Sequence, residues 1–175
     1  MQKKLRILLD LDQCLFDWIQ SHEQKFNCKL INLSQIEITH QVFLCKYDKN
    51  FWENLQLLEY PDFEPQAYVT KRINPKSYTK NCLIKNNLPL KRIYQIENYN
   101  ESKAPYVKRY GDILIDDDWT NVQQCLNSGV PALLITRPHN KSINTPYRVD
   151  HLKYSEIKAK YDQLFGSMQN KVSKH

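Results

Sequence analysis

Near the start of the chain, Leu5-Arg6-Ile7-Leu8-Leu9-Asp10-Leu11-Asp12 is an apolar run that leads into two aspartates. A short apolar run of this kind is typical of a strand buried on both faces, as in a parallel sheet. Because side chains alternate along a strand, Asp10 and Asp12 point to the same side. Two neighbouring carboxylates repel each other and need a cation or a shared proton. The run therefore predicts a central strand with an acidic pair at its carboxyl end.

A second apolar run, Asp112-Ile113-Leu114-Ile115, also leads into carboxylates, here Asp116, Asp117 and Asp118. One Asp-x-Asp pair after a strand is often no more than a strand that enters a polar turn. Open α/β sheets bind their ligands at the carboxyl ends of the strands. Two strands that both end in carboxylates therefore favour a ligand site at that edge of a parallel sheet.

Strands and helices alternate from residue 66 onwards, which predicts a doubly wound, Rossmann-like parallel sheet of five strands with helices on both faces. Asn74 and Pro75 are favoured at a helix start, Ser155 can cap the last helix, and Gly129 and Gly166 are favoured at helix ends. The opening strand is joined by strands at 67–70, 92–96, 112–115 and 132–135, with helices at 74–85, 103–110, 121–127 and 155–166 and a loop at 138–151.

A helical block separates the first strand from the second. Ser34 and Glu37 have the spacing of a capping box, and Pro61 and Pro65 close the block. The helices are expected at 15–27, 34–44 and 48–57. The expected organisation is an α/β core of residues 1–17 and 65–166, a small helical cap of residues 18–64 and a disordered tail of residues 167–175.

The totals are those of one globular domain. The chain has 175 residues, of which 41% are hydrophobic and 25% charged, so it can form one core with a modest insertion. Its five cysteines form no C-x-x-C pair and no apolar stretch has transmembrane length, which favours a soluble, cytoplasmic protein. The net charge of +6 is compatible with an anionic partner, although scattered lysines also produce a basic solvated surface.

Four features stand where the expected strands end. Asp10 and Asp12 follow the first strand, Thr70 ends the second, Lys103 lies beyond the third, and Asp116-Asp117 end the fourth. Taken singly, each feature also has a purely structural interpretation, because Thr70 could be a turn cap and Lys103 a surface lysine. Since the tips of parallel strands share one edge of the sheet, we expect the four features to converge on a single site.

In this order the motifs resemble those of the haloacid dehalogenase-type phosphohydrolases, and within that superfamily most of all the 5'(3')-deoxyribonucleotidases. Residues 9–18, LDLDQCLFDW, are similar to the family's opening motif, and residues 114–117, LIDD, to its metal motif. Residues 50–55, NFWENL, resemble an aromatic pair in its cap, and His139-Asn140 its C-terminal region. Gln13 stands where glycine is usual, and Cys14 where a small apolar residue or threonine is common.

The resemblance implies a Mg²⁺-dependent phosphomonoesterase that works through an aspartyl-phosphate. Asp10 would be the nucleophile, and Asp12 would protonate the leaving oxygen and later activate water. Thr70 and Lys103 would bind phosphoryl oxygens. The metal would be held by oxygen donors of the kind that Mg²⁺ prefers, from Asp10, Asp12, Asp116 and Asp117. By resemblance, Asp117 would be a direct ligand, and Asp116 would ligate the ion or orient Lys103.

The expected substrate is a (deoxy)ribonucleoside monophosphate. Trp18, Phe51 and Trp52 stand where a cap could stack a base over the site, but large aromatics also build cores, so each ring has two interpretations. The alternative functions are a phosphatase of nucleic-acid ends or of another small phosphate ester, and a non-catalytic binding protein on the same fold. The presence of Asp12 argues against the last of these, since losing the general acid is a simple way to lose turnover.

Overall fold

The sheet at the centre of the molecule has six parallel strands. The computed structural model describes residues 4–172 of the chain. The strands are β1 (Ile7–Leu9), β2 (Ala67–Thr70), β3 (Arg92–Gln95), β4 (Ile113–Asp116), β5 (Ala132–Ile135) and β6 (Arg148–Val149). Their order across the sheet is β3-β2-β1-β4-β5-β6, and every neighbouring pair is parallel. The predicted doubly wound parallel sheet is confirmed.

Strand β1 lies in the middle of this sheet because its residues are apolar on both faces. Leu8 and Leu9 are 0% exposed, and Leu9 pairs with Tyr68 of β2 on one side and with Ile115 of β4 on the other. Ile7 and Leu9 belong to one hydrophobic cluster, whereas Leu8 belongs to the other. The opening run therefore supplies apolar side chains to both layers of the core.

Helices cover both faces of the sheet. The face of Leu9 packs against α4 (Lys76–Lys85) and α7 (Tyr154–Val172), through residues such as Leu83 and Ile157. The face of Leu8 packs against α5 (Ala104–Tyr110) and α6 (Trp119–Asn127), through Val107 and Val122. The strand order runs outward from β1 in both directions, and the crevice at such a reversal is where open α/β sheets bind ligands.

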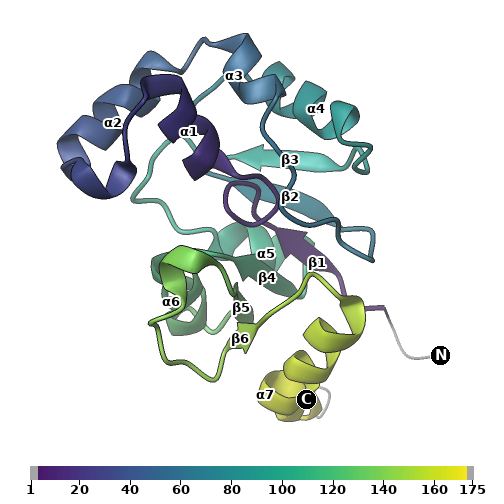
Figure 1. Cartoon of the computed structure of the whole chain (residues 1–175). Helices are drawn as coiled ribbons and strands as arrows, with labels where there is room; N and C mark the ends of the chain where they lie inside the picture. The colour runs from purple at the N-terminus through teal and green to yellow at the C-terminus, as the bar shows by residue number, and fades with distance from the viewer. Residues whose placement is uncertain (1–3, 173–175) are drawn as a thin grey trace.

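The segment between β1 and β2 is helical, as expected. It contains α1 (Trp18–Phe26), a short 3₁₀ turn (Leu30–Asn32), α2 (Gln35–Leu44) and α3 (Lys49–Glu53), and Figure 1 shows α1, α2 and α3 together at the end of the molecule opposite α7. Both hydrogen bonds of the Ser34–Glu37 capping box are present. Helix α1 begins at Trp18 rather than at Leu15, because Asp17 caps it by accepting a hydrogen bond from the N–H of Gln20.

The sixth strand lies inside the loop expected at 138–151, after a 3₁₀ turn at Pro138–Asn140. Two residues are too few to show the alternation that marks a strand in a sequence. Strand β6 forms because β5 offers it an edge: the N–H of Leu134 donates to the carbonyl of Tyr147 (2.7 Å), and the N–H of Thr136 to that of Val149 (2.8 Å). The expectation of five strands is corrected to six.

Three expected helix boundaries are also corrected. Helix α4 begins after Pro75, which occupies the cap position expected for Asn74. Helix α7 begins at Tyr154, so Ser155 lies inside it, and it continues past Gly166 to Val172. A glycine inside a helix costs about 1 kcal/mol of stability but does not end it. The tail expected from residue 167 is therefore helical as far as 172, and residues 173–175 lie outside the described part.

Neither bilayer-spanning helices nor disulfides shape the described part of the chain. No helix within residues 4–172 has the length and apolar character needed to cross a membrane. All five cysteines are free thiols.

Candidate active site

Three buried carboxylates meet at the carboxyl ends of β1 and β4. Asp10 directly follows β1, and its N–H donates to the carbonyl of Ile115 in β4 (3.0 Å). Asp116 is the last residue of β4, and Asp117 follows it. Asp10, Asp116 and Asp117 are only 5%, 0% and 8% exposed. The pairing of the two strands therefore brings together acidic residues that are more than a hundred positions apart.

Lys103 joins two of these carboxylates. It lies at the start of α5, is 1% exposed, and donates hydrogen bonds to Oδ1 of Asp10 and, at 2.7 Å, to Oδ2 of Asp116. Burial lowers the pKa of Lys103, but the two carboxylates outweigh this effect and the pKa stands above its usual value. The ammonium group is therefore charged, and it is fixed between the two strand ends.

Asp116 and Asp117 have different partners. Oδ1 of Asp116 accepts hydrogen bonds from the N–H of Asp118 (3.0 Å) and from the side-chain amide of Asn121 (3.2 Å). Oδ2 of Asp117 lies 3.0 Å from Nε2 of His139. Burial raises the pKa of Asp117 to about 6, against the lowering effect of the hydrogen bond with His139. The Asp116 carboxylate is thus engaged by Lys103 and α6, while that of Asp117 remains open toward Asp10.

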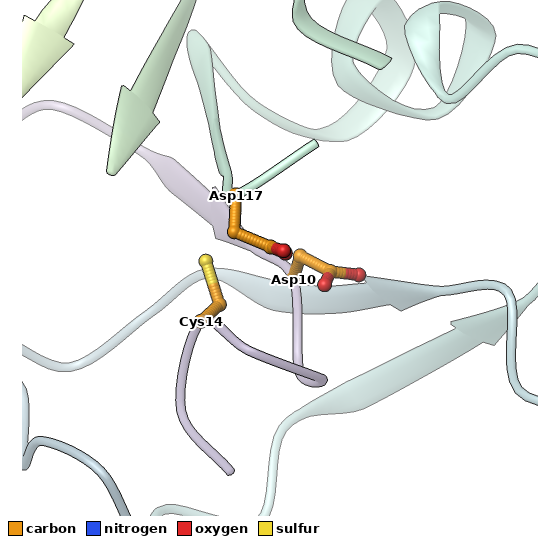
Figure 2. Close-up of side chains that lie close together, drawn as sticks. All are labelled: Asp10, Cys14 and Asp117. Atoms are coloured by element: carbon orange, nitrogen blue, oxygen red, sulfur yellow. The ribbon is translucent and has the colours of Figure 1, made fainter. Parts of the chain in front are cut away.

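Figure 2 shows Asp10 and Asp117 pointing toward each other, with Cys14 beside them. The ligand atoms of the three side chains all lie within 4.8 Å of one another. The Cys14 thiol hydrogen-bonds to the carbonyl of Ile115 (3.6 Å), and burial raises its pKa well above the usual value, as do Asp10 and Asp117. The thiol is therefore protonated, and the oxygen donors of this group belong to the two aspartates.

Asp12 lies at the same edge and has a partner that sequence reasoning missed. The Arg72 guanidinium donates to Asp12 through Nε (2.9 and 3.0 Å to its two oxygens) and through Nη2 (2.6 Å to Oδ1). Thr70, the last residue of β2, is 1% exposed, and its hydroxyl accepts a hydrogen bond from the N–H of Arg72 (3.3 Å). The only sequence signal for Arg72 is its place two residues after Thr70, which alone does not reveal its partner.

These side chains open into a cavity of about 830 Å³ between the strand ends and the cap. From the strand ends the cavity is lined by Asp10, Asp12, Thr70, Lys103, Asp116 and Asp117. Lining residues that the motifs did not indicate come from α2, from the loops after β2 and β3 and from α6, and they include Ile38, Val42, Phe43, Lys71, Arg72, Tyr99 and Gln124. The expected convergence of the four strand-end features is therefore present, and one wall is an apolar helix face.

The three cap aromatics take different positions. Trp18 lines the cavity and is partly buried. Trp52 reaches the cavity but is 2% exposed, and its indole N–H donates to the carbonyl of Cys45 (2.8 Å). Phe51 is absent from the lining and packs in the core, edge-on to Trp52 with ring centroids 5.0 Å apart. Of the two interpretations of the Phe51 ring, this arrangement favours packing, because α3 turns the ring toward the core.

The turn after Asp12 is held by Arg137, which lies just beyond the carboxyl end of β5. Gln13 has φ = 57°, a conformation that glycine adopts without strain. Arg137 donates through Nε to the carbonyl of Gln13 (2.9 Å) and through Nη2 to that of Cys14 (2.7 Å). Arg137 also pairs with Glu59 at 3.1 Å. These contacts hold the turn in place although glutamine is disfavoured there.

Replacing Gln13 with glycine is therefore expected to raise the free energy of unfolding by about 1 kcal/mol, because it removes left-handed strain at one residue. Urea unfolding of the variant and the wild-type protein measures this difference. Gln41→Gly, placed inside α2, is the matched control and should lower stability by about 1 kcal/mol. A Gln13→Gly protein as destabilised as the control would contradict the role given to the backbone here.

Known proteins are similar to this chain in structure and not in sequence. No protein-family model and no curated protein matches it. Among solved structures, an L-2-haloacid dehalogenase matches with a TM-score of 0.56 and 12% identity, covering 86% of this chain and 96% of that one. A HAD-superfamily hydrolase of subfamily IA from Geobacter sulfurreducens PCA matches with a TM-score of 0.53, at the same 12% identity and the same coverage of 86% and 96%.

Both structural neighbours are hydrolases of the haloacid dehalogenase superfamily. At this level of identity the likeness concerns the arrangement of the strands and helices alone. The fold of the chain is that of the haloacid dehalogenase superfamily.

Proposed function

We propose that the protein is a Mg²⁺-dependent phosphomonoesterase that hydrolyses nucleoside monophosphates through an aspartyl-phosphate intermediate. The observation that carries the proposal is the pair of differently partnered aspartates after β1. Asp10 is buried against the Lys103 ammonium, whereas Asp12 is bound by Arg72 and has a side chain that is 27% exposed. Two carboxylates in such different surroundings can perform two different roles.

Asp10 is suited to be the nucleophile. In the first step, one of its Oδ atoms forms a bond to phosphorus while the bond between phosphorus and the ester oxygen breaks. Phosphoryl transfer depends mainly on positioning and on neutralising the oxygens of the transferred group. The Lys103 ammonium and the Thr70 hydroxyl are the donors at this edge that would bind those oxygens.

Asp12 is suited to transfer protons. Its carboxyl group would give a proton to the departing ester oxygen and would then take one from the water that attacks the phosphorus of the aspartyl-phosphate. This second step releases inorganic phosphate and regenerates the Asp10 carboxylate. Unlike Asp10, Asp12 is accessible enough to exchange its proton with solvent between the two steps.

The donor set at the strand ends fits Mg²⁺. Asp10, Asp116 and Asp117 are buried carboxylates, and Lys103 is the ammonium partner of the first two only, so the site carries surplus negative charge. Burial raises the pKa of Asp10 well above its usual value, and Asp116 and Asp117 raise it further despite the opposing effect of Lys103. Mg²⁺ prefers carboxylate, phosphate and water oxygens, and when bound it would supply positive charge to the nucleophile and the phosphoryl group. The Asp10 and Asp117 carboxylates would hold it, with Asp12 and Asp116 beside them.

The cavity supports a nucleotide rather than a smaller ester as the substrate. Its volume of about 830 Å³ is large for a phosphate group alone. The partly buried Trp18 ring and the apolar residues of α2 line the same cavity as the carboxylates. An aromatic ring beside an apolar wall can stack a base, while the strand ends bind its phosphate.

Phosphate release from a panel of esters tests the proposal. The panel contains ribo- and deoxyribonucleoside 5'- and 3'-monophosphates, p-nitrophenyl phosphate and an oligonucleotide with a terminal phosphate, each with Mg²⁺ and with a chelator. Release from nucleotides that depends on Mg²⁺ and greatly exceeds release from the oligonucleotide is the expected result. Faster phosphate release from the oligonucleotide than from the nucleotides would indicate a phosphatase of nucleic-acid ends. No phosphate release from any of the esters would overturn the proposal.

Replacing Trp18 with alanine is expected to lower kcat/KM for the nucleotide by roughly 5- to 150-fold, because a stacked base contributes about 1–3 kcal/mol. The value for p-nitrophenyl phosphate should change much less, since this ester does not need the ring. The ratio of the two kcat/KM values in variant and wild-type protein is the measurement.

Trp119→Ala is the matched control, because Trp119 packs against the opposite core cluster and does not line the cavity. The control should leave the ratio of the two kcat/KM values unchanged. Trp18→Ala could instead leave the ratio of the two kcat/KM values unchanged and lower the melting temperature as much as expected for a core aromatic. This result would show that Trp18 only packs in the core.

A further inference from the structure

Arg72 is the largest charged side chain that the fold buries completely. Its side chain is 0% exposed, whereas that of its partner Asp12 is 27% exposed and lies on the cavity. The guanidinium contacts Asp12 through two nitrogens, with Nη2 only 2.6 Å from Oδ1. Burying an arginine costs several kcal/mol unless its partner and geometry are well matched. The position of Arg72 therefore calls for an explanation beyond packing.

The guanidinium is fixed from several sides. Its central carbon lies 5.2 Å from the centroid of the Phe16 ring and 5.4 Å from that of the Trp52 ring. Phe16 is 0% exposed, and the Trp52 indole is anchored by its hydrogen bond to the carbonyl of Cys45. Cation–aromatic contacts and the rigid plane of the guanidinium restrict its orientation. Arg72 thus presents a preorganised pair of donors to Asp12.

We propose that Arg72 is the positioning residue of the acid–base group: it acts through Asp12, holding that carboxyl in the orientation that serves the leaving oxygen. The proposal rests on the function proposed above. Arg72 bonds to one edge of the Asp12 carboxyl group, so the group cannot rotate freely about its side-chain bonds. A proton donor contributes to the transition state only when its geometry is maintained. Lysine would keep the charge but not the planar pair of donors.

The dependence of the rate on the leaving group reveals this role. A nucleoside leaves as an alkoxide that needs the proton of Asp12, whereas p-nitrophenolate leaves readily without one. In Arg72→Met, kcat/KM for the nucleotide is expected to fall about 10²-fold, at the lower end of what general acid catalysis contributes. The value for p-nitrophenyl phosphate should fall no more than a few-fold. The parameter kcat/KM is used because it reports departure of the leaving group and not the later hydrolysis of the aspartyl-phosphate.

Two further variants distinguish positioning from charge and from general damage. The kcat/KM of Arg72→Lys for the nucleotide should be close to that of Arg72→Met, because lysine lacks the planar donor pair. The double variant Asp12→Asn/Arg72→Met should be no slower on the nucleotide than Asp12→Asn alone, since Arg72 acts through Asp12. Arg6→Met is the control, because it removes the ion pair with Asp112 at the other end of β1. It should leave the ratio of the kcat/KM values for the two substrates unchanged.

The outcomes separate this inference from the proposed function. A wild-type protein that hydrolyses nucleotides, with the selective loss in Arg72→Met and the coupling in the double variant, supports both. Three outcomes would overturn the inference and leave the proposed function unaffected. They are an equal loss of kcat/KM for both substrates in Arg72→Met, a wild-type kcat/KM for the nucleotide in Arg72→Lys, and a double variant with a lower kcat/KM for the nucleotide than Asp12→Asn. A wild-type protein that hydrolyses no phosphate ester would overturn both. If Arg72→Met fails to fold, Arg72→Lys provides the same comparison of the two substrates.

Discussion

Replacing Asp10 with asparagine is expected to abolish turnover, lowering kcat by roughly 10⁴-fold or more, because loss of a nucleophile removes the covalent step itself. The amide keeps the volume of the side chain and an oxygen that can accept the hydrogen bond from Lys103. It also removes one of the three carboxyl groups that are buried together at the strand ends. The variant should therefore fold and melt at or above the wild-type temperature.

Phosphate release and trapping of the intermediate measure this effect. Wild-type protein quenched with acid during turnover should retain phosphate on the chain, and Asp10→Asn should retain none. Asp162→Asn, an exposed position on α7, is the control and should behave like the wild-type protein. A stable Asp10→Asn protein that keeps more than a small fraction of the wild-type kcat would show that another group attacks phosphorus.

Replacing Lys103 with methionine is expected to have the largest effect on stability, lowering the free energy of unfolding by about 3–5 kcal/mol. The substitution leaves Asp10 and Asp116 buried without their ammonium partner. The loss should be present at neutral pH: the pKa of Lys103 is raised, so its stabilising contribution is complete below the unfolded-state pKa of about 10.4 and is lost only at higher pH. Binding of phosphate and the rate of the chemical step should both be impaired.

Urea unfolding in the presence of a chelator, at about pH 5 and about pH 8, provides the measurement. The destabilisation of Lys103→Met should be larger at the higher pH, because the raised pKa of Asp10 makes its ionisation in the folded state increasingly costly as pH rises. Lys108→Met is the matched control, since Lys108 is exposed on the same helix, and it should change stability by no more than about 0.5 kcal/mol. If the free energy of unfolding fell by similar amounts in the two variants, Lys103 would not be the ammonium that stabilises the buried carboxylates.

The parts of the site that could be predicted from the sequence are those with a local signal. Asp10, Thr70 and Asp116 each stand at the end of a short apolar strand, and parallel pairing brings strand ends to one edge. To predict that these residues converge, it was therefore enough to place the strands correctly and to know that they are parallel. Gln13 is similar, since the resemblance had placed a glycine there and the residue indeed has a positive φ.

The parts that could not be predicted depend on contacts between distant segments. Strand β6 has two residues and forms because β5 offers an unpaired edge. Phe51 and Trp52 are adjacent in the chain, yet only packing of α3 decides which of the two rings reaches the cavity. Helix α7 passes Gly166 although the residue type favours an end, because propensity is a weak preference that context overrides.

The parallel sheet, the helical insertion after the first strand and the acidic groups at the strand ends follow from the order of residues alone, because alternation and apolar runs are local consequences of backbone geometry. The partner of each acidic group, in contrast, depends on how the chain folds. Lys103 lies 93 residues from Asp10, and Arg72 lies 60 residues from Asp12. The strength of an ion pair depends on distance and burial, which are properties of the folded chain and not of any short stretch of it. The separate roles proposed for the two aspartates therefore come from the fold, although both residues are visible in the first strand motif.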